Sequence, residues 1–470
     1  MRDCAVLTAA EMARADRLAI AAGTPGIALM ENAGRAVTRA ILRRFRPCPT
    51  VVLAGPGNNG GDGFVVARRL EEAGWPVRVA LYGEPEALRG DAARAAARWR
   101  GPLVPLSPAA LAGAGLVVDG LFGAGLARPI EGVAAETIRA IRVPVVAIDL
   151  PSGVAGDTGA VLGVAPQAVL TVTFFRLKPA HLLLPGRDLC GEVVCAPIGI
   201  PASVLDAIVP KTARNDPALW RPWLRRPASQ DHKYSRGTVT IVAGPAMTGA
   251  ARLAARAARR SGAGLVTIAA PDAASAAACR AGDPGVIVTE ASLQALLADE
   301  RRQVWLVGPG GGERAPDIAR AVLAAGRSLV ADADALRGPP EALRGIAIAT
   351  PHAGEFARLF GPPGQDRIAA VREAARRLDG VILLKGSDTI IVAPDGRVAI
   401  NSAAPAWLAT GGTGDVLAGI AAALLAQGMP PFVAAAAAAW LHARAAERAG
   451  PHLIAEDLPD HLPAVLAGLY

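Results

Sequence analysis

Apolar residues in the first part of the chain fall into short continuous runs separated by helical patterns. The runs are TVVLA, just before residue 55, and then residues 77–81, 116–120, 145–149 and 168–174. Strands that are apolar on both sides and alternate with helices are typical of a parallel sheet covered on both faces. We therefore predict an α/β domain over residues 1–207.

Helix signals accompany these strands. Thr8 and Glu11 have the spacing of a capping box at the start of a helix. Residues 26–45 have a second helical pattern, and a third helix is expected to begin near Phe64, after a glycine-rich turn. The pattern therefore predicts helices before and between the strands.

Residues 208–227 are rich in proline and arginine and have no clear period, which predicts a linker. The strand pattern then restarts between alanine-rich helices, so residues 228–470 are predicted to form a second α/β domain. Within it, VILLKGSDTIIVAPDGRVAI predicts two strands around a tight turn, followed by a hairpin at Asp395-Gly396. The most apolar stretch, Val416–Ala426, is too short to span a bilayer and predicts a buried helix rather than a membrane segment.

Composition narrows the class of protein. A chain of 470 residues, 52% hydrophobic and 19% charged, can bury two or three cores. The net charge is +8, but aromatic residues make up only 4% and no basic stripe is interleaved with them, so nucleic acid is not the expected partner. Five scattered cysteines and an N-terminus without an apolar signal core predict thiols in the cytoplasm.

The segment GPGNNGGDG, residues 55–63, follows a predicted strand and opens a helix. Its bare glycines allow backbone N–H groups to approach an anion, and a helix N-terminus adds a favourable dipole. A tight turn with an N-cap is the alternative interpretation. Asp119, Asp149 and Ser152 also follow predicted strands, and the carboxyl ends of parallel strands meet at one edge, so they are expected to converge with Asn59. Each aspartate taken alone could instead serve only as an N-cap.

GPGNNGGDG, DGLFGAGLARP, AIDLPSG and PGRDLCGEVVCAPIGIP together resemble the N-terminal domain of the bifunctional NAD(P)H-hydrate repair enzymes. The resemblance covers most of residues 8–201 and implies a Rossmann-like, three-layer epimerase of the R and S hydrates. It implies that Asn59, Asp119 and Ser152 ligate K⁺ and that Asp149 touches the substrate. Our own hypothesis is that Asp149 is the acid/base group, since a carboxylate in a partly dry crevice can be tuned toward neutrality. The hydrate-binding residues that it implies are Asn58, Asn59, Gly60, Gly61, Asp62, Gly123, Ala124, Gly125, Leu126, Ala127, Arg128, Pro129 and Asp149.

A second glycine-rich segment, TGGTGD at residues 410–415, precedes the buried alanine-rich helix. Its amides can form an anion hole, beside which Asp415 could accept a proton from a hydroxyl that attacks a phosphoryl group. A glycine turn with a favourable N-terminal charge is the alternative. GGTGD before a helix resembles the motif of ribokinase-type kinases, which implies a ribokinase-like α/β fold.

Four further segments resemble the hydrate dehydratases: HKYSRG with AGPAMTGA, GPGGG at 308–312, TPHAGEF at 350–356 and KGSDT at 385–389. His352 could alternatively be a polar loop histidine, whereas a lysine at the end of a buried strand suits phosphate. The resemblance places the hydrate against Ala250, Gly310, Gly312, His352 and Asp415. It places the nucleotide at Lys385, Gly386, Ser387, Asp388, Thr389 and Gly414.

One segment departs from the resemblance. The family has an Asn-Pro-Gly run before the glycine loop, whereas this chain has NSAAPAWLAT at residues 401–410. The glycine loop itself is intact, so the activity is still expected, but the shape of the nucleotide pocket does not follow from the resemblance.

These resemblances imply repair of NADHX and NADPHX, the hydrates of NADH and NADPH. Phosphorylation of the hydroxyl by ADP, with Mg²⁺, would turn a poor leaving group into a good one, and elimination would restore the dihydropyridine and give AMP and phosphate. The relatives also imply a homo-oligomer. Two alternatives stay open: a ribokinase-like small-molecule kinase of the hydroxymethylpyrimidine or sugar type, and a non-catalytic N-terminal binding module.

Overall fold

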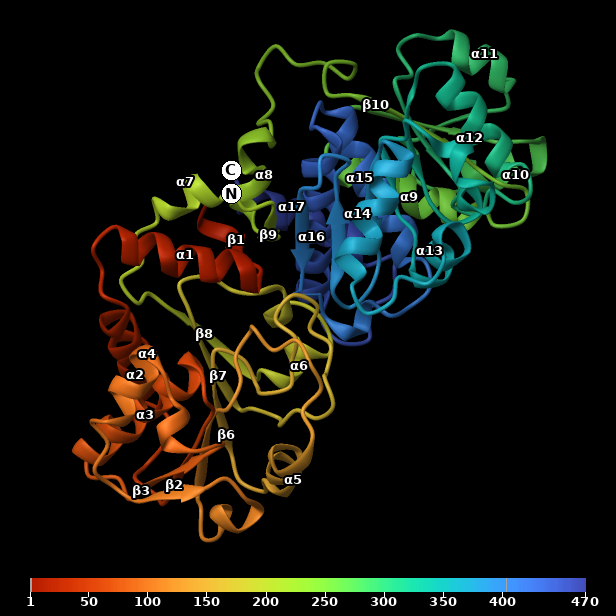
Figure 1. Cartoon of the computed structure of the whole chain (residues 1–470). Coiled ribbons are helices and arrows are strands. Elements are labelled where there is room, and N and C mark those ends of the chain that lie inside the picture. Colours follow the sequence, from red (N-terminus) through yellow and green to blue (C-terminus); the bar gives the residue numbers. More distant parts are fainter. Residues whose placement is uncertain (1, 403) are drawn as a thin grey trace. The chain divides into compact units, whose positions relative to one another are not determined.

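The computed structural model describes residues 2–402 and 404–470 (Figure 1). It divides into two compact units, Cys4–Pro210 and Lys211–Tyr470. None of the described helices combines the length and apolar character that crossing a membrane requires.

The first unit is built on a parallel sheet with strand order β4-β3-β2-β5-β6-β7-β8. Strands β2 to β4 proceed along the sheet in one direction and β5 to β8 in the other, so the order reverses between β2 and β5. The strands of this sheet are β2 Thr50–Ala54, β3 Val77–Leu81, β4 Leu103–Pro105, β5 Leu116–Gly120, β6 Val145–Ile148, β7 Leu170–Phe174 and β8 Glu192–Ala196, and the short strand β1 Ala5–Val6 lies outside it.

Helices cover both faces of this sheet, as the apolar runs predicted. Along β2, Val52 and Ala54 pack under α2 and α3, whereas Val51 and Leu53 face the cluster that contains α5. Alternate residues of one strand therefore belong to two different cores. The helices are α1 Ala9–Ala21, α2 Gly26–Leu42, α3 Asn58–Glu72, α4 Gly90–Ala96, α5 Gly132–Ala140, α6 Gly186–Leu189 and α7 Val204–Ile208.

The helix signals have different outcomes. The predicted capping box is confirmed, because the Thr8 side chain accepts from the Glu11 N–H and the Glu11 carboxylate accepts from the Thr8 N–H. The predicted start of a helix near Phe64 is wrong, since α3 begins at Asn58. The glycines of the 55–63 segment thus form the first turns of the helix, where small residues permit close packing against the neighbouring backbone.

The second unit also contains a largely parallel sheet, with strand order β12-β11-β10-β13-β14-β15-β16-β17-β18-β9. Strands β16, β17 and β18 are antiparallel neighbours, which confirms the predicted turn and hairpin. The strands are β9 Thr212–Arg214, β10 Thr238–Val242, β11 Leu265–Ala269, β12 Ile287–Thr289, β13 Val304–Val307, β14 Ser328–Ala331, β15 Ile348–Ala349, β16 Val381–Leu384, β17 Thr389–Val392 and β18 Val398–Asn401.

Helices α9, α15 and α16 pack on one face of this sheet, and α12 and α14 pack on the other. The predicted buried helix is α15, in which every residue from Val416 to Leu424 is buried. The helices are α8 Pro217–Trp220, α9 Thr248–Arg260, α10 Ala273–Arg280, α11 Leu293–Ala298, α12 Ala315–Ala324, α13 Ala353–Phe360, α14 Arg367–Leu378, α15 Thr413–Ala426, α16 Pro431–Ala449 and α17 Leu458–Ala467.

The segment predicted as a linker, residues 208–227, is largely part of the second unit. Strand β9 pairs with β18, and Trp220 in α8 is fully buried against α16. The linker prediction is therefore wrong over these elements, because proline and arginine content hid a three-residue strand too short to show a period. The boundary between the units lies between Pro210 and Lys211.

Candidate active sites

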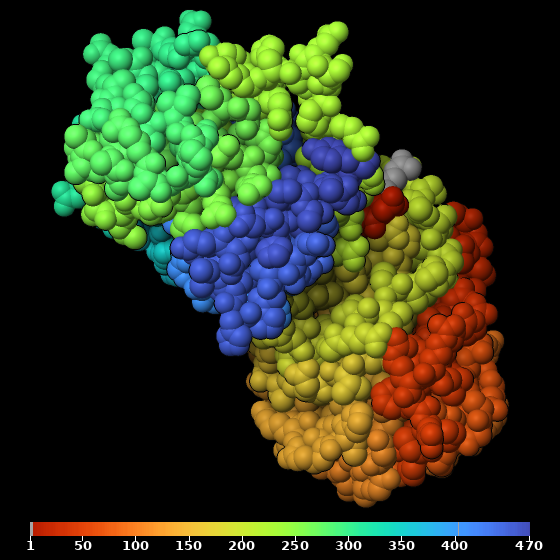
Figure 2. Space-filling view, turned by 180° about the vertical axis from the view of Figure 1, so that it is seen from behind, coloured from red at the N-terminus to blue at the C-terminus, as the bar shows by residue number. Residues whose placement is uncertain are grey.

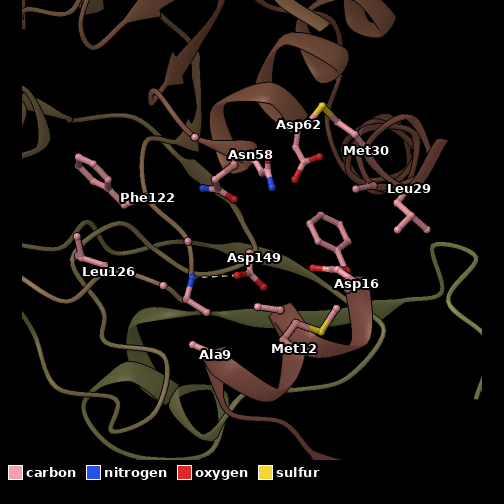
Figure 3. A pocket seen from close by; sticks show the side chains of 18 of the residues that line it. Ala9, Met12, Asp16, Leu29, Met30, Asn58, Asp62, Phe122, Leu126 and Asp149 are labelled. Atoms are coloured by element: carbon pink, nitrogen blue, oxygen red, sulfur yellow. Dashed lines mark hydrogen bonds between the residues drawn. The ribbon is translucent and has the colours of Figure 1, made fainter. Parts of the chain in front are cut away.

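The first unit contains a cavity of about 730 Å³ beside the carboxyl ends of β2 and β5 (Figure 3). This is where the strand order reverses, the place where open α/β sheets bind ligands. Apolar side chains from α1 and α2 form one wall. The polar and charged residues that line the cavity are Asp16, Asn58, Asn59, Asp62, Asp91, Arg128, Asp149 and Lys178.

Asp149 lies at the centre of this cavity with a left-handed backbone, φ 67°. Its Oδ1 accepts from Lys178 Nζ at 2.7 Å and from Thr173 Oγ1 at 2.9 Å, and its Oδ2 accepts from the Ala124 N–H at 3.0 Å. Burial would raise its pKa, but the Lys178 charge and hydrogen bond dominate and lower the pKa to about 2. The predicted tuning of Asp149 toward neutrality is therefore wrong: this carboxylate is ionised at neutral pH.

His181 holds the backbone of this arrangement. Its Nδ1 accepts from the Lys178 N–H at 2.9 Å, so its Nε2 carries the proton and donates to the Asp149 carbonyl oxygen at 2.8 Å. Burial and the nearby Lys178 charge lower the His181 pKa to about 4, so the ring is neutral. A neutral imidazole thus ties together the two loops that carry the ion pair.

Two more carboxyl groups face the same cavity. Figure 3 shows Asp62, at the start of α3, and Asp16, from α1, turned toward the space in front of Asp149. Burial and the charge of Asp149 raise the pKa of Asp62 well above its ordinary value. The pKa of Asp16 is also raised, mainly by burial. The cavity therefore sets an ionised carboxylate opposite acids that tend to keep their protons.

A separate buried oxygen cluster joins the end of β5 to the turn after β6. Ser152 Oγ donates to Asp119 Oδ1 at 2.6 Å, and the Ser152 N–H donates to Oδ2 at 2.8 Å. Asp119 is fully buried, and burial raises its pKa although these hydrogen bonds oppose the shift. The Asn59 side chain lies nearby against Gly123, with its Nδ2 buried and without a hydrogen-bond partner among the described residues.

The structure places most, but not all, of the predicted hydrate-binding residues in the cavity. The run from Gly123 to Arg128 lines it, as do Asn58, Asn59 and Asp62. Gly60 and Gly61 do not line it: a Cβ at Gly60 would stand 1.9 Å from the Gly55 oxygen, and one at Gly61 would collide with Met30. Those two glycines serve helix packing. Pro129 also lies outside the lining.

The second unit has its order reversal between β10 and β13, and two glycine loops follow these strands. The loops approach so closely that a Cβ at Gly244 would stand 1.7 Å from the Gly310 oxygen. Gly310 and Gly312 have positive φ, and the Gly312 N–H donates to Asp334 Oδ2 at 2.8 Å. Ala250 is buried in the first turn of α9, beside this contact.

The third glycine loop leads into α15, where Gly412 is the N-cap with φ 87°, a conformation that suits glycine. A Cβ at Gly414 would lie 3.5 Å from Lys385 Nζ and 3.8 Å from Asp332 Oδ2. The predicted nucleotide residues Gly414 and Lys385 therefore lie together, at the N-terminus of a helix whose amides favour an anion.

Lys385 connects the acidic groups of this site. Its Nζ lies 2.6 Å from Asp332 Oδ1 and 4.0 Å from Glu355 Oε2. The charges of Asp332 and Lys385 both act on Asp415. Burial and the Asp332 charge raise the pKa of Asp415 to about 6, although the Lys385 charge opposes the shift. A carboxylate with this pKa can accept a proton at neutral pH and release it again.

Two predicted site residues have structural partners. His352 is the N-cap of α13, and its Nδ1 accepts from the Gly354 N–H at 3.0 Å, so the loop-histidine alternative describes its contacts. The buried Asp388 carboxylate pairs with both terminal nitrogens of Arg367. Among the predicted nucleotide-binding residues 385–389, the Asp388 side chain therefore braces the loop instead of facing the glycine loop.

The segment that departs from the family, residues 401–407, includes Ala403, which lies outside the described residues. At its ends, Asn401 Oδ1 accepts from Asn215 Nδ2 at 2.9 Å, and Trp407 Nε1 donates to the Ala446 oxygen at 3.3 Å. Trp407 remains 41% exposed, so one bulky aromatic ring is held at the surface just before the glycine loop.

Sequence reasoning missed Lys178, Asp16, Asp332 and Glu355. Lys178 and Asp332 had a usable signal, since each follows the carboxyl end of a predicted strand next to one that carries a predicted site residue. Asp16 had none, because it reaches the cavity from α1, which the sequence does not place over the sheet edge.

Comparisons with known proteins agree with the two-unit division. Residues 239–466 match the family described as NAD(P)H-hydrate dehydratase, and residues 26–180 match the family described as YjeF-related protein N-terminus. The chain is 39% identical over 531 residues to the bifunctional NAD(P)H-hydrate repair enzyme of Salinibacter ruber, covering 98% of this chain and 96% of the relative. It is 38% identical over 515 residues to the enzyme of the same name from Moorella thermoacetica, covering 99% and 97%.

Among solved structures, the chain is similar to the ADP/ATP-dependent NAD(P)H-hydrate dehydratase of Bacillus subtilis co-crystallised with ATP and Mg²⁺. The identity is 28% and the TM-score 0.49, over 55% of this chain and 98% of that one.

Proposed function

The chain belongs to the family of bifunctional NAD(P)H-hydrate repair enzymes, and we propose from its two sites how its residues carry out the two reactions. It is an enzyme with two activities, an NAD(P)H-hydrate epimerase in the first unit and an NAD(P)H-hydrate dehydratase in the second. Its substrates are the hydrates NADHX and NADPHX. The assignment of individual residues and cofactors below is our proposal.

In the epimerase cavity, Asp62 supplies the proton and Asp149 stabilises the charge that develops. The proton of Asp62 passes to the hydroxyl at C6 of the hydrated ring, the C6–O bond breaks, and its electron pair leaves with water. The ring nitrogen donates its lone pair to C6, and the resulting cation is stabilised by the ionised Asp149. Water then adds to the opposite face of C6 and returns a proton to Asp62.

The charges in the cavity support this division of roles. The effect of Lys178 on the pKa of Asp149 outweighs that of burial and lowers this pKa to about 2. Asp149 is therefore a poor proton donor near neutrality. Asp62 is buried, has its pKa raised by burial and by Asp149, and faces the cavity. Paired carboxyl groups with diverging pKa values are the usual basis for separate acid and charge-stabilising roles.

K⁺ fits the oxygen cluster of Asn59, Asp119 and Ser152. Asp119 is a fully buried carboxylate with hydrogen bonds but no basic side chain among the influences on its pKa, so a cation would offset its charge. The unpartnered amide end of Asn59 leaves capacity for one more contact if the amide is turned. Carboxylate, hydroxyl and amide oxygens are ligands that hard cations accept, and K⁺ there would order the loops after β2, β5 and β6.

In the dehydratase site, Asp415 accepts the proton of the hydrate hydroxyl as that oxygen attacks the terminal phosphoryl group of ADP. The backbone amides of the 411–414 loop and Lys385 stabilise the transferring phosphoryl group. The C6–O bond then breaks and phosphate leaves with its electron pair, while the C5 proton passes to the departing phosphate and the C5=C6 double bond of the dihydropyridine is restored. The consumed ADP therefore leaves as AMP and phosphate. We propose that only the S hydrate is processed here and that the epimerase supplies it from the R form.

Mg²⁺ would be held mainly by the nucleotide in this site. The described residues contain no group of three His, Cys, Asp or Glu side chains that could hold a metal alone. Mg²⁺ commonly binds substrate phosphates with one or two carboxylates, and Asp332 and Glu355 beside Lys385 are suitable. Bound there, the ion would screen the phosphate charge.

The observation that carries the dehydratase proposal is the raised pKa of Asp415 beside Lys385 and Gly414. The test incubates separated R and S hydrates with ADP or ATP and follows recovery of dihydronicotinamide absorbance. The wild type should convert the S form at once and the R form after epimerisation, and Asp415→Ala should convert neither. A stable phosphorylated product would instead show a small-molecule kinase. Light scattering of the same preparation tests the proposed homo-oligomer.

A further inference from the structure

The segment His232–Gly237, which resembles a dehydratase motif, lies at the opposite end of the sheet from the dehydratase site. It leads into the amino end of β10, whereas Ala250, Gly310 and Gly312 follow the carboxyl ends of β10 and β13. A five-residue strand spans about 16 Å. The motif therefore lies too far from the catalytic residues to take part in the dehydratase reaction.

The motif instead forms one wall of a second cavity, of about 630 Å³. The other walls come from the end of α9, the turn before β11 and the turn before β12, so the cavity lies below the amino ends of three neighbouring parallel strands. In Figure 2 the yellow-green to green segments of the second unit, which include these residues, reach the surface.

Positive charge dominates the lining. Four cationic side chains line the cavity, Lys233, Arg236, Arg259 and Arg260, against two acidic ones, Asp231 and Asp283. Asp231 is already engaged by Arg225, by the Ser235 hydroxyl and by the Ala228 N–H.

The arginines of α9 have weak acidic partners. Asp283 lies 3.6 Å from Arg259, and Arg260 pairs at 3.4 Å with Asp460, outside the cavity. Within the described residues, no ion pair is formed by Lys233 or Arg236.

The cavity wall is rigidly built. Gly264 allows the loop to approach so closely that a Cβ there would stand 2.0 Å from the Lys233 oxygen. The Gly264 N–H donates to the Gly237 oxygen at 3.0 Å, and Arg236 donates to the Gly262 oxygen at 3.2 Å. Ser235 closes the turn, because the His232 N–H donates to its hydroxyl at 3.0 Å.

The helix dipole accounts for the position of only two of these four cations. Arg259 and Arg260 stand in the last turn of α9, where positive charge is favourable by itself. Lys233 and Arg236 come from a separate loop and bring two more positive charges to the same cavity. The two acidic residues of the lining, Asp231 and Asp283, leave a surplus of two positive charges over the four cations, which a bound anion would offset.

We propose that this cavity binds a small anion with a diphosphate group, at a site distinct from both active sites. Lysine offers a point charge, and the arginine guanidinium groups offer planar paired donors, a combination that suits several phosphate oxygens at once. The source of the diphosphate is either inorganic pyrophosphate or a nucleoside diphosphate, and both are anions of this chemistry.

The small number of lysines makes a residue-resolved test possible. The chain has four: Lys178, Lys211, Lys233 and Lys385. Lys178 is buried, Lys211 is exposed outside both sites, and Lys385 reports the dehydratase site. Acetylation of the native full-length protein, followed by mass spectrometry of each lysine peptide, gives four rates from one sample.

With inorganic pyrophosphate, acetylation of Lys233 should slow by about fivefold or more, while Lys211 is unchanged. Protection should weaken as salt rises, since the cavity is open to solvent. A parallel series with ADP distinguishes the sources: protection of Lys233 by ADP assigns a nucleoside diphosphate, and protection by pyrophosphate alone assigns the inorganic anion. Protection by neither, or equal slowing at Lys211, would overturn the proposal.

A charge-matched pair of variants tests the wall itself. Arg236→Ala should weaken protection of Lys233 by about tenfold in pyrophosphate concentration, because it removes one paired donor. Arg344→Ala removes the same charge from an exposed position outside the cavity and should leave protection unchanged. If both variants behaved alike, the effect would be one of net charge and the proposed site would be wrong. Circular dichroism of both variants confirms folding.

Discussion

Lys178 Nζ lies 2.7 Å from Asp149 Oδ1 in the epimerase cavity, where the Lys178 side chain is buried and the Asp149 side chain is 15% exposed. The two residues follow neighbouring parallel strands, β7 and β6, so the sheet itself brings them together. Thr173 adds a hydroxyl to the same carboxylate oxygen at 2.9 Å. The pair fixes a negative charge in front of the substrate while a lysine keeps it from taking a proton.

Removal of one partner of this ion pair should lower the free energy of unfolding of the first unit. Lys178→Met leaves the Asp149 charge buried without its cation, which should destabilise the first unit by about 3–5 kcal/mol. Hydrogen exchange of peptides from β6 and β7 reports this loss separately from the second unit.

The matched control is the double variant Lys178→Met/Asp149→Asn, which removes both charges. It should recover most of the protection, while the epimerase stays inactive. Equal protection in Lys178→Met and the wild type would show that the ion pair does not hold these loops.

Substitution of Asp62, unlike that of Lys178, should remove epimerase activity without lowering the stability of the first unit. Its pKa is raised by burial and by Asp149, so the folded state resists ionisation of Asp62, and Asp62→Asn removes that cost at neutral pH. In the Asp62→Asn variant we expect the backbone amides of α3 to keep or increase their protection from hydrogen exchange. Epimerisation should slow by about 10²–10⁴-fold, because the proton donor is lost.

The assay for Asp62 has an internal reference, because dehydration of the S hydrate by the same chain should be unchanged. Asp91→Asn is the control variant: Asp91 also lines the cavity but pairs with Arg94 near the surface. Normal epimerisation in Asp62→Asn would refute the acid role without affecting the family assignment.

Asp415 should give the dehydratase its pH dependence. Its pKa of about 6 is raised, mainly by burial, from an ordinary 3.8. Below about pH 6 the proton acceptor is lost, so kcat/KM should fall about tenfold per pH unit.

The sign for stability follows from the same shift. The folded state binds the Asp415 proton more tightly than the unfolded state, so the free energy of unfolding should fall as pH rises from about 4 to 6. The total is about 3 kcal/mol. Asp415→Asn should lack this decrease in denaturation curves. A difference in stability between the wild type and Asp415→Asn that does not fall over that interval would contradict the assignment.

The cation site predicts a dependence of local stability on K⁺. If Asn59, Asp119 and Ser152 hold the ion, exchange of K⁺ for choline should lower protection of the loop after β5. The loss should be about 3 kcal/mol when K⁺ had been near a hundred times its Kd.

Ser152→Ala should reduce that difference, since it removes one oxygen ligand. Thr137→Val removes a buried hydroxyl elsewhere in the same unit, one that donates to the Val133 oxygen, and should leave the difference intact. An identical K⁺ response in the Ser152 variant would place the cation elsewhere.

The sequence allowed the sheets to be predicted better than the sites. Runs such as 77–81 and 116–120 are apolar on both sides because helices cover both faces, and their bounds match β3 and β5. The convergence of Asp119 with Ser152 also followed from strand ends alone. The low pKa of Asp149 was not predicted, because it depends on the ion pair with Lys178, a residue beyond the end of β7 that had not been assigned to the site.

Glycine-rich motifs were harder to interpret, since a glycine can serve a ligand or a neighbouring backbone. Gly60 and Gly61 were predicted to bind the hydrate but pack against Gly55 and Met30. The residues that decide between these roles lie far away in the sequence or in a preceding turn, and only the fold brings them near.

The glycine loop before α15 allows the two roles to be separated experimentally. A methyl group at Gly414 would stand 3.5 Å from Lys385 Nζ and 3.8 Å from Asp332 Oδ2, in the space proposed for the transferring phosphoryl group. A methyl group at Gly411 would meet no atom within 4 Å, and neither glycine has a positive φ. Gly414→Ala should therefore raise the Kd for ADP by about tenfold or more and abolish dehydration, because the methyl group would displace the phosphoryl group from the amides that stabilise it. Gly411→Ala should have little effect. Both should unfold at the wild-type temperature, and equal ADP binding by the two variants in calorimetry would mean that the phosphoryl group does not lie between Gly414 and Lys385.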